Sequence, residues 1–255
     1  MKRYVALGSS MAAGPSIKPP AKGAPRGSGR SAGNYAHLLA RQHNLDLIDV
    51  TFSGATTANV LAEPQRGAPP QIQALDGTED LVTVTIGGND VGYVPLLMAG
   101  GLPGPIRRLP ILRRGIDDLM NRGLRDQALA GVSASLHAIG RTVRQRSPRA
   151  RIFFVDYLTL LPPAGEPAPP LPEHVADLGR HVAARLEELT AEAASATGCE
   201  LVRAAQASRG HHPWSAQPWT VGPSRSVLPW PGRPAPLHPN AAGMRAVADL
   251  VAAQL

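Results

Sequence analysis

Residues 81–90 read Leu-Val-Thr-Val-Thr-Ile-Gly-Gly-Asn-Asp, a short apolar and β-branched run that ends abruptly in two glycines and two polar residues. Such a run is typical of a strand in a parallel sheet that helices cover on both faces. Four other runs have the same character and are also expected to be strands: 3–7, 45–51, 151–156 and 200–203. Because helical patterns separate most of them, the sequence predicts an α/β protein built as a three-layer sandwich.

Three long helices are predicted from apolar stripes that recur every three or four residues. They run from about Pro172 to Gly198, from after Gly131 to before Pro148, and from about Asn240 through Val251. Each should bury one face against the sheet. With 255 residues and no repeat or linker, the chain is expected to form a single domain, 1–255.

The composition excludes several classes of protein. With 43% hydrophobic and 18% charged residues, the chain is neither disordered nor a membrane protein. Its net charge of +7 comes mostly from arginines spread along the chain, so no nucleic-acid groove is indicated. Cys199, the single cysteine, can form no internal disulfide, and Met1 to Arg3 lead directly into the first strand. We therefore expect a cytoplasmic protein, unless the sequence is the trimmed form of an exported one.

Polar residues follow three of the predicted strands and open the last helix. These four blocks are Gly8–Gly14, Ser53–Thr57, Gly87–Asp90 and His238–Gly243. Ligands of an open parallel sheet bind beyond the carboxyl ends of its strands, so the blocks should converge on one edge. The first block lacks the Lys-Ser/Thr ending of a phosphate-binding loop and the spacing of a dinucleotide-binding turn, which argues against nucleotide binding.

The residue types in these blocks suit acyl transfer. A serine hydroxyl becomes a good nucleophile when an imidazole takes its proton, and Ser10 and His238 form such a pair. The tetrahedral intermediate also needs hydrogen-bond donors for its oxyanion. The backbone amides of Ser10 and Gly54 and the side-chain amide of Asn89 can supply them.

These four blocks, in this order, resemble those of the SGNH or GDSL hydrolases, a family of serine esterases and lipases. The resemblance covers almost the whole chain and implies a flavodoxin-like, five-stranded parallel sheet. By motif match it assigns the nucleophile to Ser10, the base to His238 and the oxyanion donors to Ser10, Gly54 and Asn89. It implies no cofactor, and a small-molecule ester or lipid as substrate.

Two departures from the family pattern concern the catalytic acid. Ser9 stands where the family has aspartate in its first block, and Ala235 stands where the acid usually precedes the histidine by three residues. The main-chain carbonyl of Ala235 is our first candidate to orient His238 in place of that acid. Asp156, at the end of the fourth strand, is the alternative. For Ser9 we expect only a cap on the turn after the first strand.

Other residues are candidates for specificity. Trp214, Trp219 and Trp230 lie in a long loop before His238 and either form a substrate pocket or pin that loop. Residues 94–119 mix apolar residues with arginines, which indicates either a lid with at most transient contact to a membrane surface or an ordinary surface segment. The adjacent His211 and His212 point apart and have no partner at ligand spacing, so no metal is expected.

The function we predict is hydrolysis of carboxylic esters by a Ser-His dyad without a cofactor. Two alternatives remain open: a carbohydrate O-deacetylase of the same family, and a degenerate, non-catalytic protein that binds an acyl or glycan ligand. The sequence does not specify the acyl chain length or the oligomeric state.

Overall fold

The computed structural model describes residues 1–107, 109–223 and 235–255. In these residues one five-stranded sheet is present, with all strands parallel and in the order β2-β1-β3-β4-β5. The strands are β1 (Arg3–Gly8), β2 (Asp46–Asp49), β3 (Leu81–Thr85), β4 (Arg151–Val155) and β5 (Glu200–Val202). This is the flavodoxin-like order, which confirms the predicted fold, and it places the topological switch point between β1 and β3.

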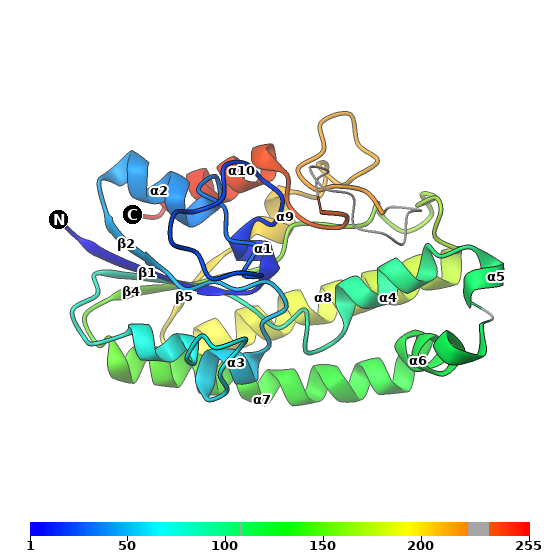
Figure 1. The fold of residues 1–255 in the computed structure, drawn as a ribbon, viewed down its shortest axis with the longest axis horizontal. Coiled ribbons are helices and arrows are strands. Elements are labelled where there is room, and N and C mark those ends of the chain that lie inside the picture. The colour runs from blue at the N-terminus through cyan, green and yellow to red at the C-terminus, as the bar shows by residue number, and fades with distance from the viewer. Residues whose placement is uncertain (108, 224–234) are drawn as a thin grey trace.

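Helices cover both faces of the sheet, as expected for a three-layer sandwich (Figure 1). On one face lie α2 (Tyr35–His43) and α10 (Ala241–Ala252), over a core that includes Tyr4, Phe153 and Met244. On the other lie α3 (Thr57–Leu61), α7 (Arg122–Arg146) and α8 (Glu173–Ala196), over the larger core. The remaining elements are α1 (Ser10–Ala13), η1 (Gln71–Ala74), α4 (Tyr93–Gly100), α5 (Gly104–Arg107), α6 (Pro110–Met120) and α9 (Ala204–Ala207).

The three predicted helices are present, although α7 begins earlier than expected. Its start is fixed by Asn121, whose side chain accepts a hydrogen bond from the backbone amide of Leu124 at 3.1 Å. The first turns of α7 are largely exposed, so they carry no apolar stripe that would predict a helix.

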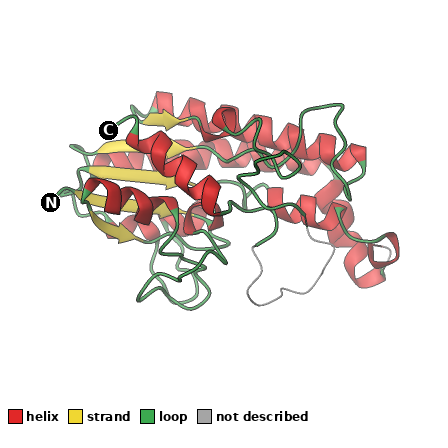
Figure 2. Cartoon of the chain, turned by 90° about the horizontal axis from the view of Figure 1, so that it is seen from above, coloured by secondary structure: helices red, strands yellow, loops and turns green. Residues whose placement is uncertain are grey.

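The long helices extend beyond the sheet. At about 1.5 Å per residue, the 25 residues of α7 span about 37 Å, whereas the five residues of β4 span about 17 Å. The far ends of α7 and α8 therefore project past the carboxyl ends of the strands, where α4, α5 and α6 lie against them (Figures 1 and 2). No helix in the described residues is both long and apolar enough to cross a membrane.

Residues 94–119, the predicted lid, are mostly helical. Leu96 and Leu97 of α4 are fully buried in the larger core, so this part of the segment belongs to the folded body. In contrast, most residues of α5 and α6 are exposed or half-buried. That any of this segment moves as a lid stays a prediction.

Packing of α7 against α8 depends on a close approach at Gly140. A Cβ atom at this position would lie 2.3 Å from Thr197 Oγ1 and 2.8 Å from Thr197 Cβ, whereas one at Gly131 on the same helix would meet nothing within 4 Å. We predict that Gly140→Ala lowers the free energy of unfolding by about 1–3 kcal/mol through overpacking. Gly131→Ala should raise it by about 0.5–1 kcal/mol through helix propensity. Urea denaturation of both variants measures the two changes in the free energy of unfolding, and equal changes would contradict the prediction.

Candidate active site

The turn that presents Ser10 is fixed by hydrogen bonds to its backbone. At the end of β1, the amide of Gly8 donates to Gln71 Oε1 at 2.7 Å, and Gln71 Nε2 donates to the Gly8 carbonyl at 3.0 Å. The amide of Ser9 then donates to the Thr85 carbonyl at 2.9 Å. A Cβ atom at Gly8 would lie 2.6 Å from that carbonyl oxygen, so only glycine fits. Ser10 follows as the first residue of α1 and is almost fully buried.

His238 lies against this serine from the opposite end of the chain. Its Nε2 atom is 2.8 Å from Ser10 Oγ, and its Nδ1 atom is 2.7 Å from the carbonyl oxygen of Pro236. A main-chain carbonyl thus occupies the place of the missing acid, but the expectation that it belongs to Ala235 was wrong by one residue.

The backbone conformation of Leu237 accounts for this difference. Leu237 has a φ of 57°, in the left-handed region, and this turn directs the carbonyl two residues before the histidine toward the ring. Hydrogen bonds of 2.9 Å, from the Leu237 amide to the Val221 carbonyl and from the Val221 amide to the His238 carbonyl, hold the turn. Asn240 caps the helix α10 that follows. A strained residue held in this way is a common feature of functional sites.

The two contacts of the His238 ring define its proton arrangement. A carbonyl oxygen can only accept, so Nδ1 carries the proton that it donates to Pro236. Nε2 of the neutral ring therefore has a free lone pair, which accepts the hydroxyl proton of Ser10. Burial lowers the pKa of His238 below its ordinary value, and the Pro236 contact raises it by a smaller amount. The imidazole is thus neutral at pH 7 and able to accept a proton.

Gly54 and Asn89 belong to two loops that are joined at this edge of the sheet. Asn89 Nδ2 donates to the carbonyl of Ala55 at 2.8 Å, which places its amide beside the Gly54 turn and leaves its second N–H available. Gly54 has a φ of 80°. Among the described residues, no acceptor takes the backbone amide of either Ser10 or Gly54.

Asp90 ties the same two loops together. Its carboxylate accepts from the backbone amide of Thr57 at 3.0 Å and from the Thr57 hydroxyl at 2.5 Å. Burial raises the pKa of Asp90, while the Thr57 contacts lower it by less. The blocks that contain Gly54 and Asn89 are therefore fixed relative to one another at the start of α3.

Tyr157 is a residue of the site that the sequence did not reveal. Its hydroxyl lies 3.1 Å from Ser9 Oγ and accepts a hydrogen bond from the Gly88 amide at 3.0 Å. Ser9 therefore bonds to Tyr157, and the expected cap on α1 is not formed by its side chain. Because Ser9 precedes Ser10 and Gly88 precedes Asn89, this one hydroxyl joins the first block to the third.

Asp156, the alternative acid, makes no hydrogen bond to His238. Its Oδ1 atom accepts from the Ala205 amide at 2.7 Å, and Oδ2 has no hydrogen-bond partner among the described residues. Burial raises its pKa to about 7. The structure thus gives His238 a carbonyl rather than this carboxylate as its partner.

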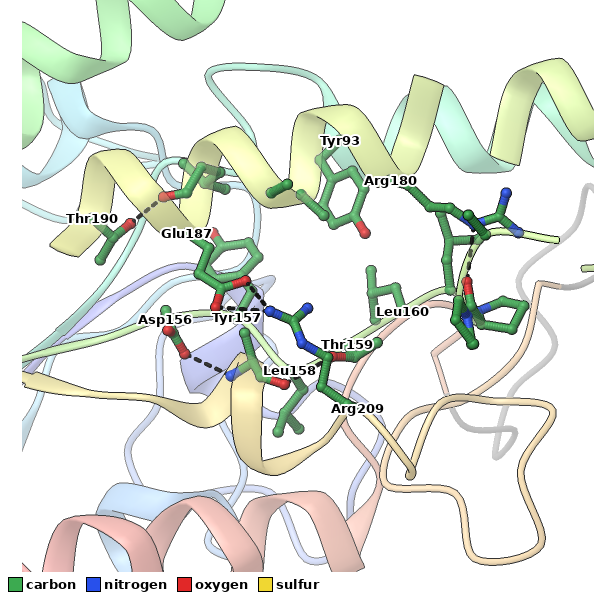
Figure 3. Close-up of a pocket in the computed structure, with 18 residues that line it drawn as sticks. Tyr93, Asp156, Tyr157, Leu158, Thr159, Leu160, Arg180, Glu187, Thr190 and Arg209 are labelled. Atoms are coloured by element: carbon green, nitrogen blue, oxygen red, sulfur yellow. Dashed lines mark hydrogen bonds and ion pairs between the residues drawn. The ribbon is translucent and has the colours of Figure 1, made fainter. Parts of the chain in front are cut away.

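A cavity of about 390 Å³ adjoins the site behind Tyr157 (Figure 3). It lies between α8 and the segment after β4, with a mostly aliphatic lining that includes Leu158 and Leu160. Arg209 spans part of its wall and donates to both carboxylate oxygens of Glu187, at 3.0 and 2.9 Å. Neither Ser10 nor His238 lines this cavity, so it is adjacent to the reactive pair and not centred on it.

The structure describes two of the three tryptophans of the long loop before His238. Trp214 Nε1 donates to the Pro169 carbonyl at 3.1 Å, and the Trp219 ring stacks on His211 with centroids 4.0 Å apart. Trp230 lies outside the described residues. Their role in a substrate pocket stays a prediction. In the residues that the structure describes, no group of three or more His, Cys, Asp or Glu could hold a metal ion.

The protein combines a parallel α/β sheet with a Ser-His pair at the carboxyl edge of that sheet. Comparisons with known proteins identify the family to which this combination belongs. The pattern of the GDSL-like lipase/acylhydrolase family matches residues 6–246. Lipase 2 of Streptomyces coelicolor is 31% identical over 261 residues, which cover 96% of this chain and 83% of the relative. The chain therefore belongs to the GDSL-like lipase/acylhydrolase family, whose members are carboxylic ester hydrolases. The predicted family and enzyme class are confirmed.

Solved structures with the same fold include phospholipase A1 from Streptomyces albidoflavus NA297 and an extracellular lipase from Streptomyces rimosus. Their TM-scores are 0.78 and 0.79, each at 23% identity, and each match covers 100% of this chain and at least 99% of the other. A similarity of this degree establishes the fold. The expected cytoplasmic location finds no support here, since the lipase from S. rimosus is described as extracellular.

Tyr157 offers a test of how the blocks are positioned. We predict that Tyr157→Phe lowers kcat about tenfold or more with a smaller change in KM, because Ser9 and Gly88 lose their common partner and the neighbouring reactive groups shift. Tyr93→Phe is the control, since Tyr93 borders the same cavity, is buried, and makes no side-chain hydrogen bond among the described residues. Kinetics with p-nitrophenyl butyrate measure both. A Tyr157→Phe enzyme with unchanged kcat would contradict the positioning role.

Proposed function

We propose that this protein hydrolyses carboxylic esters of lipids through a dyad of Ser10 and His238, oriented by the carbonyl of Pro236 instead of an acid. The observation that carries the proposal is the continuous chain of contacts from Ser10 Oγ to His238 Nε2, 2.8 Å, and from His238 Nδ1 to Pro236, 2.7 Å. This geometry supports proton transfer from the hydroxyl to the ring. The name of the relative that is 31% identical, Lipase 2, favours a lipid ester over other esters.

In the first half of the reaction, Ser10 Oγ attacks the acyl carbonyl carbon while its proton moves to His238 Nε2. The carbonyl oxygen becomes an oxyanion, which the amides of Ser10 and Gly54 and the side-chain amide of Asn89 stabilise. His238 then gives its proton to the leaving alcohol as the carbon–oxygen bond breaks. An acyl-enzyme ester on Ser10 and a free alcohol remain.

In the second half, water takes the place of the alcohol. His238 removes a proton from the water as its oxygen attacks the acyl carbon, and a second oxyanion forms at the same donors. The proton returns to Ser10 Oγ as the acyl ester breaks, which releases the carboxylic acid. Both halves use only groups of the protein, and no cofactor enters the balance.

The absent acid affects the rate less than a wrong tautomer would. In triads, replacing the acid by an amide reduces kcat by about 10⁴-fold because the imidazole takes the wrong tautomer. Here the Pro236 carbonyl enforces the same tautomer that an acid would. What is lost is the attraction between a carboxylate and the imidazolium that forms in the transition state.

The first experiment compares wild type, Ser10→Ala, His238→Ala and Asp156→Asn on p-nitrophenyl esters from acetate to palmitate. We predict that the first two substitutions reduce kcat/KM by about 10³-fold or more at every chain length. Asp156→Asn keeps the acceptor for Ala205 and should retain activity, because the Asp156 carboxylate makes no hydrogen bond to His238 in the structure. A wild type no faster than Ser10→Ala would instead favour a non-catalytic binding protein.

The pH dependence tests the partner of His238. A general base works when neutral, and burial lowers the pKa of His238 below the ordinary value of 6.5. We therefore predict that kcat/KM rises with pH to a midpoint below 6.5 and is flat above neutrality. A midpoint near 7 that disappears in Asp156→Asn would show that Asp156, whose pKa is about 7, governs the rate and would refute the carbonyl-supported dyad.

A further inference from the structure

One sequence feature is not used by the proposed chemistry. Residues 107–114 read Arg-Arg-Leu-Pro-Ile-Leu-Arg-Arg, an apolar tetrapeptide with two arginines on each side. We refer to residues 109–112 as the apolar tip. Leu109, Ile111 and Leu112 are 47%, 90% and 40% exposed, and together they make up half of the six exposed large apolar side chains of the described chain. A run of exposed apolar residues of this length usually marks an interaction surface.

The tip is held by an anchored helix. Ile116, on the inner face of α6, is buried, and α6 ends at the capping residue of α7, Asn121. Next to this junction Arg125 donates to the Val91 carbonyl at 2.7 Å. Because α6 is fixed in this way, its first turn points outward and leaves Leu109 and Ile111 exposed.

The position of the tip relates it to the active site. Both views of the fold show α5 and α6 at the end of the molecule toward which the strands point, opposite both termini (Figures 1 and 2). Ser10 and His238 lie at the carboxyl edge of the same sheet. A flat surface that contacts the tip would thus face the carboxyl edge of the sheet.

We propose that the apolar tip inserts into an anionic lipid surface while Arg113 and Arg114 contact lipid phosphates. Apolar side chains next to arginines are the composition of segments that bind at a membrane interface. Arg113 and Arg114 are exposed. The ion pair of Arg113 with Asp117, at 3.6 Å, is a weak surface pair, so the guanidinium group of Arg113 can still bind a phosphate. A second copy of this chain would bring the same arginines together, and their repulsion disfavours it as the partner.

This proposal rests on the proposed function, because an enzyme that hydrolyses lipid esters must reach them at a lipid surface. It assigns substrate access to a segment that takes no part in catalysis. The expected consequence is that the tip increases hydrolysis of lipid in vesicles and leaves hydrolysis of a dissolved ester unchanged.

The test measures binding to vesicles of ether-linked lipids, which contain no ester to hydrolyse. One set is made of phosphatidylcholine, and the other contains equal parts of phosphatidylcholine and phosphatidylglycerol. The tip variant is Leu109→Ser with Ile111→Ser. Leu109 is the N-cap residue of α6, a position where serine is favoured, and Ile111 is almost fully exposed, so the fold should be kept. Leu255→Ser is the control, because Leu255 is equally exposed, 47%, at the opposite end of the molecule.

The tip variant should bind the mixed vesicles about tenfold or more weakly than wild type, and Leu255→Ser should bind as wild type does. Replacing Arg113 and Arg114 by Gln should weaken binding about fivefold for each arginine on the mixed vesicles, with little effect on phosphatidylcholine. All of these variants should hydrolyse p-nitrophenyl acetate at the wild-type rate. A wild type that does not hydrolyse esters would contradict the proposed function, but it would not change the measured binding to vesicles. Equal binding by wild type and the tip variant would overturn the proposal. The proposal would also be overturned if sedimentation showed that wild type is a dimer and the tip variant a monomer, and if wild type did not bind vesicles.

Discussion

The hydrogen bond between Ser10 and His238 joins residues 228 positions apart, and most other contacts of the site fix the position of one of these two residues. On one side Gly8 turns the chain sharply after β1, where Gln71 grips its amide and its carbonyl. On the other, Leu237 adopts a left-handed conformation that costs about 1–2 kcal/mol for a residue with a side chain. Complete burial of the Leu237 side chain in the larger core offsets this cost.

The same pair depends on the register of the sheet. Gly8 pairs with Thr85 across β1 and β3, so the residues that follow these strands, Ser10 and Asn89, emerge side by side at the switch point. A slip of one residue would reverse the faces of β1 and separate these groups. The Tyr157 hydroxyl, bonded to both Ser9 and Gly88, makes such a slip costlier, because it would leave buried polar groups unpaired.

Much of this arrangement follows from sequence because strand runs and the polar blocks after them are local patterns. Residues 81–90 alone indicate a buried strand and its loop, and the order of the blocks predicts the convergence of Ser10 with His238. Other features depend on contacts that no local pattern encodes. Nothing in the composition around Leu237 signals a left-handed residue, so the carbonyl was assigned to Ala235. Tyr157 is one tyrosine after a strand, 69 residues from the amide it binds. The helices of 94–119 are short and rich in Pro and Gly, which hides their periodicity.

In the proposed mechanism, the carbonyl of Pro236 takes the place of a catalytic acid, which brings both a gain and a loss. A carboxylate beside His238 would have to be kept charged in a largely buried place, and Asp156 shows the difficulty, since burial raises its pKa to about 7. A carbonyl is neutral, so it fixes the tautomer of the imidazole without a charge to desolvate. The loss falls on the imidazolium, which no anion of the described residues stabilises, in keeping with the lowered pKa of His238. In the proposed mechanism, a weaker base shifts more of the stabilisation of the transition state onto the oxyanion donors, and this gives a physical reason for the rigid ties that hold Gly54 and Asn89 together.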